Sequence, residues 1–300
     1  MRRHAEAEVR ALEPGDVARV ATIFRSAFNE MYRRRGFGPV VADTAVGAVI
    51  AEAYRALDPE HCLVVTAAGR VVGSGFLHVR GATAGVGPIT IDPGYQGAGF
   101  GRALMEEICA RSDRAGVRSL RLIQDAFNEA SFCLYGRVGF VGRETLVRGS
   151  FRSRPQLGTA APARRARPSD LDQVVGLERE LLGIERRKDH ELLLRMGDVL
   201  LSGDGTLHGS LGRLVRGGVA VLGPAVSRDL EAMLDLIDRA TRDLPARTDI
   251  RLLVPARQGD LLAALYETGF EVHSLCTYMV RGDYTPFAGY YVPTLFPESG

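Results

Sequence analysis

The spacing of hydrophobic residues predicts alternating strands and helices along the chain. Residues 9–12 form a short strand candidate, and Pro14-Gly15-Asp16 leads into an amphipathic helix. The apolar positions of this helix recur at helical spacing and are Val17, Val20, Ile23, Phe24 and Phe28. Residues 29–53 follow a less regular pattern that includes Arg33-Arg34-Arg35, for which a solvated surface run is the favoured interpretation.

More strands and a long helix follow. Residues 61–67 and 71–79 are predicted to form a hairpin around Ala68-Gly69-Arg70. Residues 86–91 are expected to form the central strand, 119–123 a buried strand and 142–151 a closing strand. Between the central and buried strands, apolar residues at helical spacing predict a helix that closes at 114–117. The pattern indicates an α/β (α+β) fold.

The segment between the central strand and the long helix is rich in glycine. It begins with the turn signal Asp92-Pro93-Gly94 and continues as Gln96-Gly97-Ala98-Gly99-Phe100-Gly101-Arg102. Free N–H groups and the helix dipole favour an anion at a helix start, and glycine lets a phosphate approach without a Cβ in the way. The residues predict a site for a phosphate-bearing ligand, to which Arg102 could add charge. A glycine-rich turn without a ligand is the alternative.

A second segment begins at Asn128. Asn128 is expected to cap a short helix, and Tyr135 lies seven residues on, two turns along the same face. Such a face can hold a ligand between an amide and a phenol. A capped helix with a core tyrosine is the bland alternative.

These two segments resemble those of a known family. Gln96-x-x-Gly99-x-Gly101 resembles the acyl-CoA pyrophosphate loop of the GNAT superfamily of N-acyltransferases. It lacks the Gly-Lys-Ser/Thr of a Walker loop and the G-x-G-x-x-G of a dinucleotide site. Asn128 to Phe140 resembles the family pattern N-x-x-A-x-x-(F/L)-Y-x-x-x-G-F, with Ser131 in place of alanine.

The resemblance covers nearly all of residues 1–150 and implies a cofactor site. The co-substrate would be acetyl-CoA or another acyl-CoA, and no metal is expected. The residues implied in cofactor binding are Ile89, Thr90, Ile91, Gln96, Gly97, Ala98, Gly99, Phe100, Gly101, Arg102, Asn128 and Tyr135.

The resemblance also implies a reaction. Pantetheine would lie between the strand at 89–91 and its parallel neighbour near 119–124, which splays away. A neutral amine would attack the thioester directly, backbone N–H near Ile91 would stabilise the oxyanion, and Tyr135 would protonate the thiolate. Glu30, His78 and Asp125 are open candidates for the base. The rival interpretation is a non-catalytic acyl-CoA-binding regulatory module.

The second half of the chain echoes the first. Residues 152–162 have the composition of a linker, after which 164–171 echoes 10–17 and Leu222-Gly223-Pro224 echoes Val86-Gly87-Pro88. No glycine loop follows Pro224; a helix starts directly from Ser227 or Asp229. The prediction is a GNAT domain at 1–152, a linker at 153–162 and a degenerate GNAT-like domain at 163–300. Each domain would be a mixed, mostly antiparallel sheet flanked by helices, with one splayed parallel pair of strands.

The C-terminal residues 284–300 contain Phe287, Tyr290, Tyr291 and Phe296. This segment is too apolar for a free tail. Packing across the domain junction is the default expectation, and insertion into the catalytic cleft is the weaker one.

Charge and cysteine content limit the partners and the compartment. The first 150 residues carry a net charge of +3 and the rest −1, so neither half has the basic footprint of a nucleic-acid binder. The four cysteines are spread out and are expected to be reduced core thiols. With neither a signal-peptide pattern nor a membrane-length apolar run, we expect a cytoplasmic monomer or homodimer that acts on a small-molecule or peptide amine.

Overall fold

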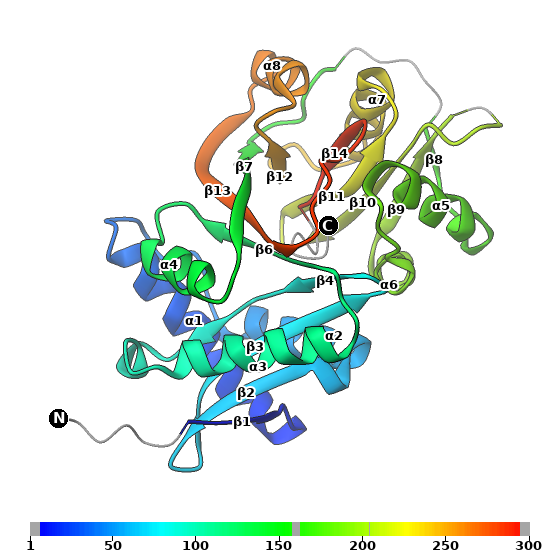
Figure 1. The fold of residues 1–300 in the computed structure, drawn as a ribbon. Helices are drawn as coiled ribbons and strands as arrows, with labels where there is room; N and C mark the ends of the chain where they lie inside the picture. The colour runs from blue at the N-terminus through cyan, green and yellow to red at the C-terminus, as the bar shows by residue number, and fades with distance from the viewer. Residues whose placement is uncertain (1–6, 158–162, 204, 295–300) are drawn as a thin grey trace. The chain divides into compact units, whose positions relative to one another are not determined.

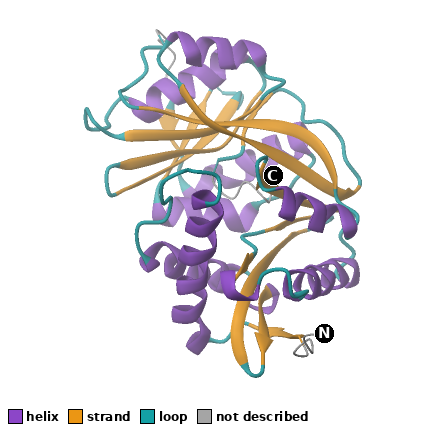
Figure 2. Ribbon diagram, turned by 90° about the vertical axis from the view of Figure 1, so that its left-hand side faces the viewer, coloured by secondary structure: helices purple, strands orange, loops and turns teal. Residues whose placement is uncertain are grey.

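The computed structural model describes residues 7–157, 163–203 and 205–294 (Figure 1). The chain divides into two compact units, each of which combines strands with helices (Figure 2). Unit 1 comprises residues 1–120 and 128–141, and unit 2 comprises residues 121–127 and 142–300. No helix within the described ranges is long and apolar enough to cross a membrane.

Unit 1 is built on an antiparallel sheet. Its strands run in the order β1 (Ala7–Ala11), β2 (Cys62–Ala67), β3 (Arg70–Arg80) and β4 (Thr83–Val86), and β5 (Thr90–Ile91) also pairs with β3. Its helices are α1 (Val17–Arg33), α2 (Thr44–Leu57), α3 (Phe100–Arg114) and α4 (Glu129–Arg137). Figure 1 shows α3 crossing in front of β2 and β3. The predicted hairpin and the long helix are confirmed.

Two details of unit 1 differ from the sequence prediction. The stretch expected to be less regular contains α2, whose first turn is capped by the Asp43 side chain, 2.8 Å from the N–H of Ala45. The expected central strand at 86–91 is broken into β4 and β5 at the cis peptide Gly87–Pro88. Proline has no N–H to donate to a neighbouring strand, so the ladder cannot run through it.

Unit 2 holds a larger mixed sheet. Its strand order is β6 (Ser119–Asp125), β13 (Glu271–Gly282), β7 (Val141–Phe151), β12 (Asp249–Pro255), β11 (Val219–Ser227), β10 (Gly209–Arg216), β9 (Asp198–Ser202) and β8 (Arg164–Arg165). A short strand, β14 (Tyr290–Val292), pairs with β11. The helices are α5 (Leu171–Leu182), α6 (Arg187–Met196), α7 (Leu230–Thr241) and α8 (Gly259–Glu267).

The strands of unit 2 come from both sides of the predicted linker. β7 precedes residues 153–162 and yet lies between β13 and β12, which follow them. A cut at the linker would therefore separate β7 from both of its neighbouring strands. Residues 158–162 of the linker and Phe296 of the tail lie outside the described residues.

The same order of elements occurs twice along the chain. From β1 to β7 and again from β8 to β13, a strand and a short 3-10 turn precede two helices, a run of strands, and then helix, strand, helix and strand. The opening turns match in detail, because Arg10 pairs with Asp16 at 2.6 Å and Arg164 pairs with Asp170 at 2.7 Å. A cis peptide at Gly223–Pro224 matches the one at Gly87–Pro88.

Candidate functional site

The glycine-rich segment of unit 1 forms an open turn between β5 and α3. The Asp92 side chain holds this turn, because it accepts from the N–H of Gly94 at 2.9 Å. Arg19 of α1 anchors the same carboxylate at 2.5 Å and donates to the Val71 carbonyl of β3 at 3.1 Å. The turn is therefore tied to both the first helix and the sheet.

Two glycines give the turn its shape. Gly97 has φ of 77° and Gly99 has φ of 91°, in the left-handed region that favours glycine. A Cβ at either position would meet nothing within 4 Å, so the space beside both residues is open. Gly99 is the N-cap of α3 and has no side chain to bind the N–H groups of the first turn, which lack acceptors inside the helix. The turn fits an external anion.

The other residues of this segment have distinct environments. The Gln96 amide donates to the Ile91 carbonyl at 3.1 Å. Phe100 is buried against Tyr95, so only its backbone can face a ligand at this turn. Arg102 is exposed and pairs with Glu106 at 2.8 Å. Ala98 and Gly101 complete the segment, the former exposed and the latter half-buried.

Gly73 and Gly75 of β3, which belong to no sequence motif, bring β5 close to β3. A Cβ at Gly73 would lie 2.4 Å from the Ile91 side chain, and one at Gly75 would lie 2.6 Å from the Ile89 side chain. Thr90 is buried between them, with its hydroxyl 2.9 Å from that of Ser74. Glycine inside a strand is a signal of close approach, and here it sets the position of Ile89 and of the two β5 residues.

The capped helix predicted at Asn128 is confirmed. Asn128 is the N-cap of α4; its side chain accepts from the N–H of Ser131 at 3.3 Å and donates to the Ser131 hydroxyl at 2.8 Å. Ser131 in turn hydrogen-bonds Tyr135, one helical turn further on. Burial raises the pKa of Tyr135 to about 12, against the small lowering effect of Ser131. Tyr135 therefore keeps its proton at neutral pH.

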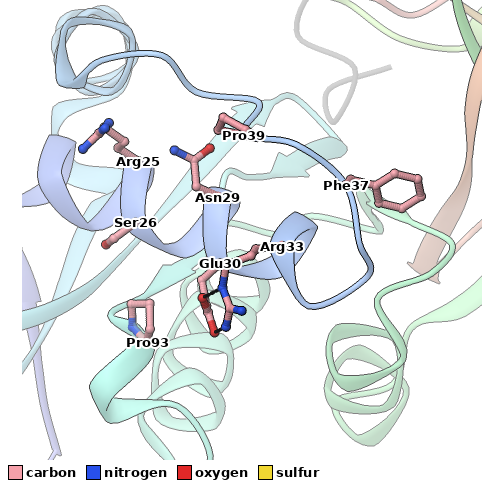
Figure 3. A pocket seen from close by; sticks show the side chains of 8 residues that line it. All are labelled: Arg25, Ser26, Asn29, Glu30, Arg33, Phe37, Pro39 and Pro93. Carbon is pink, nitrogen blue, oxygen red and sulfur yellow. Dashed lines mark hydrogen bonds and ion pairs between the residues drawn. The ribbon is translucent and has the colours of Figure 1, made fainter.

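Glu30 borders a hollow in unit 1. The hollow measures about 420 Å³ and is lined by Arg25, Ser26, Asn29, Glu30, Arg33, Phe37, Pro39 and Pro93 (Figure 3). Glu30 pairs with Arg33 at 2.7 Å and with Arg34 at 2.9 Å. Hydrogen bonds from these two arginines lower the pKa of Glu30 to about 2, so it is an anion throughout the neutral range. Pro93 belongs to the glycine-rich segment, so the hollow lies next to that segment.

His78 lies in the interior of unit 1. Its side chain is 2% exposed, its ring centroid lies 4.0 Å from that of Tyr54 in a tilted arrangement, and its Nε2 is 3.0 Å from the Gly87 carbonyl oxygen. Its Nδ1 is 3.5 Å from Asp58, which also binds Arg80 at 2.8 Å. These contacts are those of a histidine held by the core, and they leave little of its ring open to a substrate.

Asp125 lies in unit 2, at the end of β6. It is 7% exposed and pairs with Arg148 of β7. The Cys276 thiol of β13 donates to it at 3.7 Å, and burial raises the pKa of that thiol to about 12. Cys62 and Cys109 are buried as well, but Cys133 is exposed on α4, so the expectation of four core thiols is wrong there.

The second half has a different helix start at the corresponding place. No glycine lies between β11 and α7, and the N-cap of α7 is Asp229. Of the two predicted helix starts, Ser227 and Asp229, the structure has the second. The Asp229 carboxylate accepts from the N–H of Ala232 at 2.8 Å. The Asp229 carboxylate thus binds a first-turn N–H group of α7, whereas no side chain caps the first turn of α3.

The helix α8 corresponds to α4 in the same way. Phe140 donates its N–H to the Tyr135 carbonyl at 3.0 Å, and Phe270 donates to the Leu265 carbonyl at 3.0 Å. Leu265 therefore stands in the place of Tyr135. Gln258 is the N-cap residue of α8, as Asn128 is of α4, but its side chain makes no capping hydrogen bond. Tyr266 is 46% exposed and faces elsewhere.

Comparison with known proteins connects these features to one family. Residues 42–140 match the family described as acetyltransferase (GNAT) family. Over 63 residues the chain is 38% identical to the ribosomal protein bS18-alanine N-acetyltransferase of Escherichia coli K12, and over 87 residues it is 34% identical to the glucosamine 6-phosphate N-acetyltransferase of Trypanosoma brucei brucei. These matches span 21% and 27% of this chain, and 41% and 57% of the two curated relatives.

Solved structures extend the likeness of fold to almost the whole chain. A candidate acetyltransferase from Pyrococcus horikoshii matches with a TM-score of 0.79 at 20% identity, covering 98% of this chain and 96% of its own. A GCN5-related N-acetyltransferase from Sphaerobacter thermophilus matches with a TM-score of 0.64 at 14% identity, covering 94% and 97%. The expected mixed α/β fold, with a mixed sheet flanked by helices, is confirmed.

Proposed function

We propose that the chain, whose residues 42–140 match the GNAT acetyltransferase family, transfers an acetyl group from acetyl-CoA to a primary amine. The open turn at Gly97–Gly99 carries the proposal. It precedes the first-turn N–H groups of α3, which have no side-chain cap, and the positive end of the α3 dipole, and neither glycine has a side chain in the way. A pyrophosphate fits these features, which supports Gln96 to Arg102 as its binding segment.

The residues of β5 and α4 have further parts in this proposal. The backbone of Ile89, Thr90 and Ile91 would bind the pantetheine arm, and N–H near Ile91 would stabilise the oxyanion of the tetrahedral intermediate. Tyr135 would give its proton to the departing thiolate. Burial raises the pKa of Tyr135 to about 12, so the phenol is protonated at neutral pH and carries the proton that this role requires. Asn128 and Ser131 would hold the phenol in place.

The hollow beside Glu30 is the proposed site of the acceptor amine. Glu30 is ionised at neutral pH and lies on the wall of the hollow, so it can attract an ammonium group. With a pKa of about 2 it is a weak base, and it would pass the proton to water rather than keep it. His78 and Asp125 stay candidates for the base, but burial and their ion pairs count against both.

We further propose that residues 163–300 are a degenerate copy of the first domain, joined through the linker at 153–162. The repeated order of elements and the matching Arg–Asp turns support this relation. The copy lacks the glycine turn, and leucine replaces the acid at the place of Tyr135. It would therefore bind no acyl-CoA.

An acceptor screen with acetyl-CoA, monitored by release of free thiol, tests the proposal. We expect thiol release that depends on an added amine, with small amines and peptide N-termini both in the panel. CoA binding without thiol release across the panel would instead favour the alternative function, a non-catalytic acyl-CoA-binding module.

A further inference from the structure

In unit 2, the strands β11 and β12 are paired only at their beginnings. They run parallel and pair over three positions, from Val219 opposite Asp249 to Val221 opposite Arg251. Further along, at 225–227, β11 pairs with β14 instead, in antiparallel register. The C-terminal segment thus enters at the point where the parallel pairing stops.

The inserted segment is bound from the β12 side as well. The N–H of Leu253 on β12 donates to the Thr294 hydroxyl at 2.8 Å. Just beyond β12, the Gln258 side chain makes two bonds to one residue of the segment. Its amide donates to the Tyr291 carbonyl at 2.7 Å, and its oxygen accepts from the Tyr291 N–H at 2.6 Å. Gln258 therefore recognises the main chain of an extended strand.

The side chains and glycines of the region fit this segment closely. Tyr291 and Val292 are buried, and the Tyr291 ring lies 4.7 Å from that of Phe287. A Cβ at Gly223 of β11 would lie 2.7 Å from the Val292 carbonyl oxygen, and one at Gly289 would lie 2.3 Å from the Ser227 carbonyl oxygen. Both strands come together only because these residues are glycine.

We propose that the space between β11 and β12 is a strand-binding site, and that residues 287–294 of the chain itself are its ligand. This inference rests on the proposed repeat relation, in which the space corresponds to the gap that receives pantetheine in the first domain. Gln258 stands in the place of Asn128, which is implied in cofactor binding there, and binds a peptide main chain instead. The second domain is thus closed to acyl-CoA twice, by a filled gap and by a missing glycine turn.

Amide hydrogen exchange on the full chain tests the proposal without any CoA or acceptor, so its failure is distinct from failure of the acetyltransferase assignment. We expect residues 290–292 to be protected in the unmodified protein. In Gln258→Ala, which loses two hydrogen bonds, exchange at 290–292 should accelerate by at least about tenfold, while β9 and β10 stay unchanged. Gln173→Ala, at an exposed glutamine of α5, is the control and should change neither.

A trans-binding experiment sharpens the test. The chain ended after Asp283 is mixed with a labelled synthetic peptide of residues 284–294, and fluorescence anisotropy is followed. We expect saturable binding that a scrambled peptide does not show and that Gln258→Ala weakens by about tenfold. If the shortened chain does not fold, the exchange result decides alone. Unprotected amides at 290–292 in the unmodified protein, or a folded shortened chain that ignores the peptide, would overturn the proposal.

Discussion

The two halves of the chain start corresponding helices in opposite ways. α3 begins at Gly99, which has no side chain and leaves the first-turn N–H groups to an external partner. α7 begins at Asp229, whose carboxylate takes up the N–H of Ala232. The helix dipole favours an anion at both places. The comparison shows how one residue decides whether that anion comes from a ligand or from the chain.

The largest expected effect comes from giving the first half the helix start of the second. Gly99→Asp introduces a carboxylate at φ of 91° and directs it at the N–H groups proposed for the pyrophosphate. The new side chain strains the backbone, its carboxylate binds the N–H groups, and its charge repels the pyrophosphate. The affinity for CoA should therefore fall by about 100-fold or more. Calorimetric titration of the folded variant measures this.

The matched control for that substitution lies at the other end of the same helix. Gly116 also has positive φ, 72°, and a Cβ there would meet nothing within 4 Å. Gly116→Asp therefore carries the same kind of strain and the same charge, and it should leave CoA affinity unchanged. Equal losses in both variants would show that the effect is one of stability rather than of the anion site.

The second prediction concerns the tyrosines of α4 and α8. Tyr135→Phe removes the proposed acid and should lower kcat by roughly 10²–10⁴-fold while sparing CoA affinity. Tyr266→Phe removes the hydroxyl of the exposed tyrosine of α8, one residue past the place of Tyr135, and it should leave turnover unchanged. Steady-state kinetics with a responsive acceptor compare the two, and normal turnover by Tyr135→Phe would return that residue to a core role.

The third prediction uses acidic residues on the first helices of the two halves. Glu178 of α5 is buried and pairs with Arg186 at 2.5 Å, whereas Glu30 of α1 pairs with arginines at the surface. Burial alone would raise the pKa of Glu178, but the charge of Arg186 lowers it to about 2. Glu178→Gln leaves Arg186 buried without its counter-charge and should destabilise the chain by about 3–5 kcal/mol.

The pH dependence of that loss follows from the same pKa. Because the folded value is near 2 and an unfolded glutamate titrates near ~4.3, the stabilisation by Glu178 is complete above that unfolded value and declines as pH falls toward 2. Denaturant unfolding at pH 7 and at pH 3 should show a smaller difference between wild type and Glu178→Gln at the lower pH. A difference that grows on acidification would contradict the ion-pair account.

The smallest expected effect is at Glu30. Glu30→Gln removes the charge proposed to attract the acceptor, so the KM for the amine should rise roughly tenfold. Thermal stability should not change measurably, because its ion pairs are exposed. Glu52→Gln breaks a similar surface pair with Arg55 on α2, away from the hollow, and serves as the control. Equal KM values in the two variants would remove Glu30 from the acceptor site.

Local patterns allowed much of the structure to be predicted. The turn at 68–69, the cap at Asn128 and the start of α7 at Asp229 each depend on residues near one another in sequence. The chemistry of a cap or a glycine turn is local, so a single sequence shows it.

The features that were missed depend on distant partners. The sequence gives no sign that β7 lies between β13 and β12, because strand order is set by contacts between segments more than 100 residues apart, such as Ser150 with His273. The place of β14 beside β11 is hidden for the same reason. His78 is likewise a candidate base in the sequence and a core residue in the fold, since its burial comes from Tyr54 and Asp58.

A calorimetric titration of the unmodified full chain with CoA tests the central comparison most directly. If the glycine start of α3 admits a pyrophosphate and the aspartate start of α7 excludes one, the chain binds one CoA. Two sites per chain would contradict the account of the second half, and the absence of any binding would contradict the account of the first.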